Sequence, residues 1–128
     1  MDNVLIIDTQ LPSLNDYQYA CRSHWSKGQK FKAEAEETIG WYIHLSKAQK
    51  RLRAVKNPCE IHIEWHEGTR KRDVDNIQSA QKFILDALQQ YKILINDSRK
   101  YVKQIHHNII DDTRTFVIVR FIEEESKQ

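Results

Sequence analysis

The stretch that indicates the fold most clearly is Arg70-Lys71-Arg72-Asp73-Val74-Asp75-Asn76. Three basic residues run directly into two aspartates that stand one residue apart. Asp75 and Asn76 are both good helix N-caps, and a helical pattern begins at Ile77. Apolar residues then return every three or four positions, as on the buried face of an amphipathic helix. This face comprises Ile77, Ala80, Phe83, Ile84, Ala87, Leu88 and Tyr91.

The opposite face of the predicted helix is polar and carries Asp75, Ser79, Lys82 and Asp86. Acids at a helix start, with a lysine further along the same ridge, suggest a cation site with a charged assistant. A purely structural interpretation stays open, because acids stabilise a helix N-terminus and Lys82 with Asp86 can form an exposed ion pair. Two features argue against it. A cap needs one short polar side chain where three stand here, and the basic run gains nothing from the helix dipole.

Length and composition indicate one domain over residues 1–128, since 128 residues with 40% hydrophobic content can bury a single core. The net charge of +2 means that nucleic-acid binding must depend on local clusters of charge. Cys21 and Cys59 lack metal-binding spacing and are expected to be free thiols, although a bridge between them stays open. No apolar run reaches the length of a membrane span, and no signal peptide is evident. We therefore expect a soluble, cytoplasmic protein.

The other predicted elements are read from short apolar patterns. They are a strand over 4–7, a loop over 11–17, a long helix over 29–53, a strand over 61–66, and strands over 101–110 and 115–122. Residues 111–114 are expected to close the last two strands into a hairpin. The last strand is apolar on both faces, which favours a central or covered position. The element order predicts an α+β fold, with a small mixed or antiparallel sheet of about four strands and two main helices packed on it.

Two further groups of residues are candidates for binding. The segment with Arg22, His24, Trp25, Lys27, Lys30 and Lys32 mixes cations with aromatics. This mixture suits phosphate contact and base stacking, and an ordinary polar loop explains it equally well. His62, Glu64 and His66 line one face of a strand and could bind zinc. No fourth ligand is evident, and a solvated strand face would produce the same alternation.

Three segments together resemble the RusA family of phage-type Holliday junction resolvases. They are Arg72-Asp73-Val74-Asp75-Asn76-Ile77, Phe83-Ile84-Leu85-Asp86-Ala87-Leu88 and Ile93-Leu94-Ile95-Asn96-Asp97, and the early Leu11-Pro12-Ser13-Leu14-Asn15 resembles the Pro-rich loop of that family. The resemblance implies a RusA-like nuclease domain that acts as a crossover junction endodeoxyribonuclease in DNA recombination and repair. It also implies a bacterial or phage-encoded homodimer that binds four-way junction DNA. A flap nuclease, or a non-catalytic DNA-binding phage accessory protein, stays open as an alternative.

The resemblance also implies roles for particular residues. Asp73, Asp75 and Asp97 match the three aspartates that hold Mg²⁺, with Mn²⁺ as an alternative ion. The family lysine follows the second aspartate by one helical turn, where this chain has Ser79. Counting back from Asp86 gives Lys82 instead. The expected DNA contacts are Arg70, Lys71, Arg72, Arg22, Lys27 and Lys30.

The chemistry of phosphodiester hydrolysis agrees with these assignments. It needs an activated water, in-line attack and relief of charge on the leaving oxygen, which Mg²⁺ held by carboxylates can supply. Each chain offers one acid cluster, so a twofold dimer presents two clusters for paired cuts. Apolar residues of the last strand, together with Trp41 and Tyr42, are candidates for the dimer interface.

Overall fold

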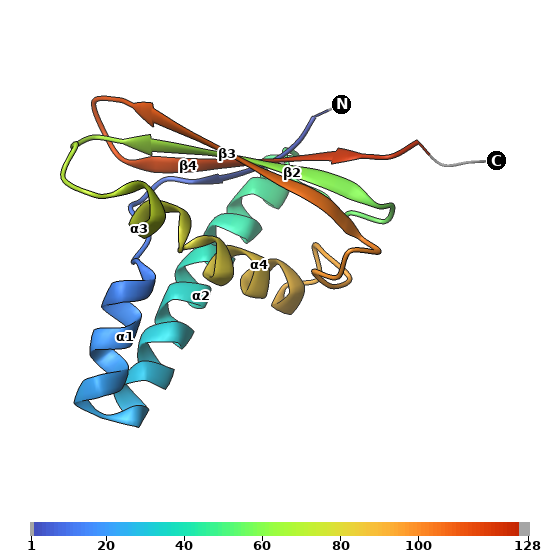
Figure 1. The fold of residues 1–128 in the computed structure, drawn as a ribbon. Coiled ribbons are helices and arrows are strands. Elements are labelled where there is room, and N and C mark those ends of the chain that lie inside the picture. The colour runs from blue at the N-terminus through green and yellow to red at the C-terminus, as the bar shows by residue number, and fades with distance from the viewer. Residues whose placement is uncertain (1, 126–128) are drawn as a thin grey trace.

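A four-stranded sheet with all of its helices on one face forms the protein (Figure 1). The computed structural model describes residues 2–125. Along that part of the chain the elements are β1 (Asn3–Ile7), α1 (Leu14–Ser23), α2 (Trp25–Ala48), β2 (Cys59–Glu67), α3 (Val74–Gln78), α4 (Gln81–Gln90), β3 (Val102–Asp111) and β4 (Phe116–Glu123). The predicted α+β fold with a mixed four-stranded sheet is confirmed. The sequence from Glu123 onward also predicts a polar, frayed tail; Glu123 is the last residue of β4, and residues 126–128 lie outside the described part.

The strand β2 confirms the clearest sequence pattern, because its residues alternate between two environments. Ile61, Ile63 and Trp65 face the helices and are fully buried. Glu60 and the other alternate residues are half-buried on the opposite face, which no described element covers. Burial of one face and solvation of the other is what strict alternation produces in a sheet.

The predicted hairpin of the last two strands is wrong. The sheet order is β1-β4-β2-β3, so β2 lies between β3 and β4 and is parallel to the first and antiparallel to the second. The short connection between β3 and β4 crosses the end of β2, where Asp112 N donates to Glu67 O at 2.9 Å. Gly68 permits this crossing, since a Cβ there would lie 3.0 Å from Arg114 Cα. Four residues can span the two strand spacings, about 10 Å, as easily as they close a hairpin. The expectation of a central β4 is confirmed.

Two helices, α1 and α2, differ from the sequence-based expectation. The predicted loop over 11–17 ends at Ser13, which caps α1 through a reciprocal capping box with Asp16. The long helix starts at Trp25 and ends at Ala48 instead of running over 29–53. Beyond it the chain turns to pair with β1, where Val4 N donates to Arg51 O at 2.9 Å. Asn3 fixes this turn by accepting from Arg53 N and donating to Arg53 O.

The helix predicted from Ile77 onward is two helices, and its first residue is Val74, with Asp73 in the N-cap position. The interruption falls at Ser79 and Ala80. The Ser79 hydroxyl donates to Asn76 O at 2.7 Å and accepts from Leu14 N at 2.9 Å. This serine therefore joins the start of α1 to the end of α3. Its hydroxyl also competes with the regular backbone hydrogen bonds of a continuous helix.

The predicted apolar face of this region is nevertheless buried, apart from the half-buried Tyr91. α4 packs closely against α2 at Gly40 of α2. A Cβ on Gly40 would lie 2.2 Å from the ring of Tyr91, the C-cap of α4. Phe83 on α4 contacts Tyr17 of α1, with ring centroids 5.9 Å apart, and so joins the α1–α2 hairpin to the core. The far end of that hairpin extends away from the sheet (Figure 1).

Both cysteines are free, as predicted, with Cys21 exposed and Cys59 buried. Burial raises the pKa of the Cys59 thiol to about 11, with a smaller contribution from the Glu123 carboxylate. No helix within residues 2–125 has the length and apolarity needed to span a membrane.

Candidate functional site

The end of β2 that leads into α3 is fixed by a buried ion pair. Glu67 continues the helix-facing row of Ile61, Ile63 and Trp65 and is only 5% exposed. Its Oε1 lies 3.5 Å from Arg72 Nε, a charge contact without hydrogen-bond geometry. Arg72 Nη1 also donates to Leu11 O at 3.1 Å. Glu67 was not among the predicted site residues, although a charged residue on a core-facing row just before the acidic turn was the signal for it.

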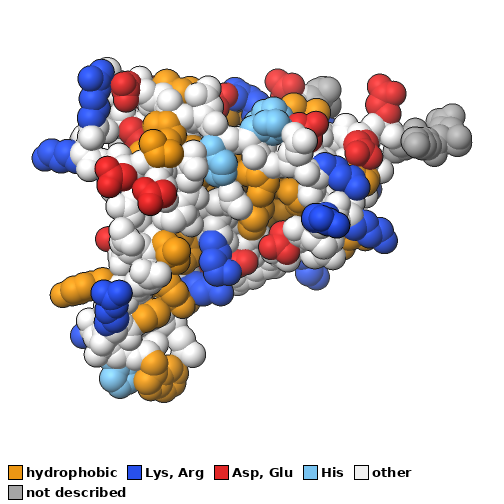
Figure 2. Space-filling model, in the orientation of Figure 1, with side chains coloured by type: hydrophobic (Ala, Val, Ile, Leu, Met, Phe, Trp, Pro, Cys, Tyr) orange, Lys and Arg blue, Asp and Glu red, His pale blue; other side chains and the backbone are white. Residues whose placement is uncertain are grey.

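The two aspartates of the acidic turn present free carboxylates. Asp73 and Asp75 are both exposed, and Figure 2 shows acidic side chains gathered over α3. Asp73 occupies the N-cap position but its side chain makes no capping hydrogen bond. Asp75 Oδ1 accepts only from Asn76 N, at 3.2 Å. Among the described residues neither carboxylate has a cationic partner, so helix capping does not account for the pair.

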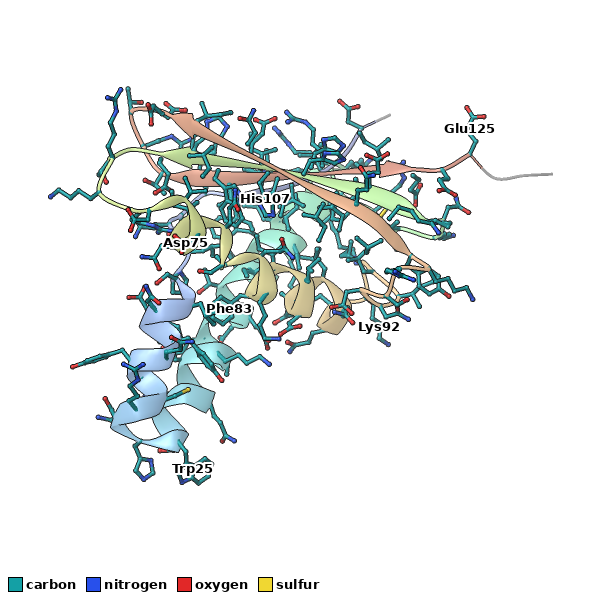
Figure 3. All side chains as sticks on the ribbon, viewed as in Figure 1. Trp25, Asp75, Phe83, Lys92, His107 and Glu125 are labelled. Carbon is teal, nitrogen blue, oxygen red and sulfur yellow. The ribbon has the colours of Figure 1, made fainter. Side chains whose placement is uncertain are left out.

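The third predicted acid, Asp97, lies at the opposite end of the molecule. It belongs to the segment between α4 and β3, and β3 begins at Val102 beside Cys59. The acidic turn instead follows Glu67, the other end of β2, and nine residues of strand span roughly 26 Å. Figure 3 shows the same separation, with Asp75 and Lys92 at opposite ends of α4. One chain therefore brings Asp73 and Asp75 together and leaves Asp97 apart.

Lys82 lies in the first turn of α4, on the polar ridge predicted for it. Its side chain is 64% exposed, and its Nζ is 3.8 Å from Asp86 Oδ2. Asp86 also lies 3.4 Å from Lys32 Nζ on α2. The exposed ion pair of the structural interpretation is thus present, and the lysine remains accessible to a ligand approaching α4.

The basic run has three different environments. Arg72 is turned inward, as described above. Arg70 is almost fully exposed and lies 3.3 Å from Asp111 Oδ2. The exposed side chain of Lys71 contacts no partner within the described part of the chain. Arg70 and Lys71 are therefore the members of the run that can meet a large polyanion.

The mixed basic and aromatic segment is a helical tip and not a loop. His24 caps α2 and stacks on Trp25, with ring centroids 6.0 Å apart. Trp25 is 67% exposed at the end of the α1–α2 hairpin (Figure 3). Arg22 and Lys27 are exposed on the same tip, where Figure 2 shows hydrophobic, histidine and basic side chains together. Lys30 is also exposed but pairs with Glu34 at 4.0 Å.

A half-buried histidine holds the start of α4 against the sheet. His107 Nδ1 accepts from Trp65 Nε1 at 2.9 Å, and its Nε2 donates to Gln81 Oε1 at 2.8 Å. These contacts select the neutral tautomer with its proton on Nε2. Burial lowers the pKa of His107, which favours the same neutral form. His107 was not among the predicted site residues. One signal was available, since one of two consecutive strand histidines must face the core.

The predicted row of His62, Glu64 and His66 does not converge on one point. His66 contacts Asp112 through Nδ1 at 2.9 Å and Glu64 through Nε2 at 3.1 Å, and Glu64 also pairs with Arg120. The pKa of Asp112 is lowered, first by the hydrogen bond from Thr113 N and next by the contact with His66. His62 instead stacks on a histidine of β3.

Comparison with known proteins identifies a family. A family model described as Endodeoxyribonuclease RusA matches residues 12–120, which is most of the chain. None of the curated proteins compared with the chain matches it. The matched residues include the acidic turn, α4 and Asp97, so the resemblance found in the sequence is confirmed.

Proposed function

Since this chain belongs to the RusA family of endodeoxyribonucleases, which hydrolyse DNA phosphodiester bonds, we propose that it resolves four-way junctions with Mg²⁺ in recombination and repair. The observation that supports this best is the pair of exposed carboxylates, Asp73 and Asp75, directly after a basic turn. Unpaired acids would repel a phosphate backbone unless a cation joined them to it. The proposal therefore accounts for their lack of a cationic partner.

The donor set of the acidic turn suits a hard cation. Asp73 and Asp75 offer only oxygen atoms, and the nearest basic residue of the turn, Arg72, is engaged with Glu67. Mg²⁺ prefers carboxylate oxygens and keeps several of its waters, so two or three aspartates are sufficient. When bound, the ion supplies an activated water and charge relief on the leaving oxygen. The two carboxylates would hold it, with Mn²⁺ as an alternative, at the entrance to α3.

Asp97 joins the same site only if a second copy supplies it. We propose a homodimer in which the partner subunit's Asp97 approaches Asp73 and Asp75, because one chain separates them by the length of β2. Twofold symmetry then gives two equivalent sites for paired cuts. Two surfaces could form the interface: the open sheet face with Val4, Ile6 and Ile118, and α2 around the exposed Trp41. Tyr42 is less available, since it is half-buried and donates to Asp8 O.

The DNA would contact the site from two sides. Arg70 and Lys71 would bind phosphates beside the acids, and Arg72 would support their loop from behind. Lys82 would neutralise charge at the scissile phosphate. The hairpin tip with Arg22, Lys27 and Lys30 extends about 15 Å from α3, the length of a ten-residue helix. This reach suits contact with a second arm of a branched substrate, and Trp25 offers a stacking surface for an unpaired base. We place this activity in the cytoplasm of a bacterium or of a phage-infected cell.

A cleavage assay tests the proposal directly. The protein would be incubated with a synthetic four-way junction, a flap and a plain duplex, each with Mg²⁺, with Mn²⁺ and with chelator. We expect paired cuts in the junction, no cut in the duplex, and no activity in chelator. Preferential cleavage of the flap would instead assign the protein to flap processing. Binding of the junction without cleavage under every condition would identify a non-catalytic DNA-binding protein.

A further inference from the structure

Three metal-ligating side chains meet on the open face of the sheet. Glu60 and His62 belong to β2, and because they are two residues apart they point to the same side of the sheet. His106 is the residue of β3 directly paired with His62 in the parallel register. The two imidazole rings stack, with centroids 4.2 Å apart and planes 16° apart. The register of two strands thus places two imidazoles and a carboxylate together.

The ligand atoms are already close to the spacing that a metal requires. Glu60 Oε1 lies 2.7 Å from His106 Nε2 and 3.6 Å from His62 Nε2. All three ligand atoms are within 4.8 Å of one another. Tetrahedral zinc with bonds of about 2.1 Å places its ligand atoms about 3.4 Å apart. Zinc binding would require the partly exposed side chains to rotate out of the stacked arrangement into that geometry.

This cluster is separate from the acidic turn in place and in chemistry. It lies near Cys59, at the other end of β2, and on the face of the sheet opposite the helices. Two imidazoles and one carboxylate favour Zn²⁺, whereas Mg²⁺ prefers oxygen ligands alone. Within the described residues it is the one group of three such side chains with this spacing. His66 is excluded from it because both of its nitrogens already contact carboxylates.

We propose that Glu60, His62 and His106 bind a Zn²⁺ ion, with water completing its coordination. The ion would join β2 to the edge strand β3 at the end where the chain enters from the segment that carries Asp97. Cys59 N donates to Tyr101 O at 2.8 Å at the same end. The zinc site would therefore stabilise the edge of the sheet and the attachment of that segment. The site needs no DNA and no Mg²⁺, so it stands or falls independently of the nuclease proposal.

Zinc binding to the full chain tests this assignment. Calorimetric titration with ZnCl₂ in buffer with excess Mg²⁺, which would occupy the acidic turn, should give one zinc ion per chain. The melting temperature should rise by several degrees when zinc is about a hundredfold above its Kd. His106→Gln and His62→Gln should each abolish the shift, and Glu60→Gln should reduce it. Co²⁺ in place of zinc should give a visible absorption band that the two histidine variants lose.

Three control variants separate this site from other zinc ligands. His44→Gln removes an exposed histidine on α2, Cys21→Ser removes the exposed thiol, and Asp75→Asn alters the acidic turn. All three should bind zinc as the unchanged protein does. Unchanged zinc binding by His106→Gln would overturn the proposal, as would loss of binding in Asp75→Asn alone. Circular dichroism of each variant would confirm that it is folded. Substitutions of exposed side chains of this kind usually change stability little.

Discussion

The ionisable groups at the two ends of β2 differ in whether they have partners within the fold. At the Cys59 end, Glu60 contacts two histidines, so its charge has partners within the fold. At the Glu67 end, the buried Glu67 has Arg72, but Asp73 and Asp75 just beyond it have no cationic partner among the described residues. Both ends are rich in polar groups. Only the acidic turn leaves like charges unneutralised.

This difference indicates where an external ligand is needed. Two neighbouring carboxylates without a partner repel one another, and an arrangement of this kind is retained at sites that bind a cation. The Glu60, His62 and His106 side chains already contact one another, so the carboxylate has partners without a metal. The proposed catalytic site therefore lies at the acidic turn, and the proposed zinc site lies at the histidine cluster.

The largest expected effect is on the acidic turn. Asp75→Asn keeps the shape and capping ability of the residue but removes a negative ligand. Mutation of a residue that orients a metal ligand lowers activity by about 10- to 100-fold. Loss of a direct ligand should therefore slow junction cleavage by more than that. Junction binding, measured by gel shift, should persist or tighten because repulsion with phosphate falls. Cleavage at the original rate would remove Asp75 from the mechanism.

Mixed dimers can show whether the two ends of β2 cooperate across subunits. Asp75→Asn and Asp97→Asn chains should each be inactive alone. If each site is shared between the subunits, one site of a mixed dimer contains both altered residues and the other site contains neither. Mixing should therefore restore single nicks in the junction. If each chain formed its own complete site, the mixture would stay inactive, and the proposed sharing of Asp97 would be wrong.

The buried pair at the Glu67 end should be the largest contributor to stability among the ion pairs. Arg72→Met leaves Glu67 buried without its cation, which should lower the free energy of unfolding by about 3 kcal/mol. Arg70→Met is the matched control, since it breaks an exposed pair and should cost less than about 1 kcal/mol. Urea unfolding of the two variants measures both values. Equal losses would show that burial of Glu67 does not matter.

His107, which holds the start of α4 between the two ends, predicts a pH dependence. Its pKa is lowered in the folded chain from the usual 6.5, so on acidification the unfolded chain takes up the proton first. Its contribution to stability should be complete above pH 6.5 and decline as the pH falls below that value. Urea unfolding at pH 7.5 and pH 5.5 should show a smaller difference for His107→Gln than for the unchanged chain. His44→Gln should keep the original difference; an unchanged difference in His107→Gln would refute the assignment.

The smallest expected effect on stability is that of Lys82. Lys82→Ala removes one exposed contact with Asp86, which retains Lys32, so the free energy of unfolding should change by less than about 0.5 kcal/mol. If Lys82 acts at the phosphate, the single-turnover cleavage rate should fall more than the affinity for the junction. A rate close to that of the unchanged chain would reduce Lys82 to a partner of Asp86.

Three features could be predicted from residue spacing alone: the two faces of β2, the buried face of α4, and the acidic turn with its basic neighbours. These features depend on residue spacing along one element, and burial enforces that spacing wherever the element packs. The family resemblance also followed from short ordered segments around Asp73 and Asp97. What the sequence left undecided involves partners far away along the chain.

Four features follow from packing and not from residue spacing: the end of α2, the break at Ser79, the place of β2 between β3 and β4, and the distance of Asp97 from Asp75. Asn3 fixes the segment that follows the long helix by bonding Arg53, fifty positions away. Leu14 engages Ser79 from sixty-five positions away. Periodicity describes which face of an element is buried but not which element buries it, because strand pairing and long-range hydrogen bonds depend on the packed arrangement of the whole chain.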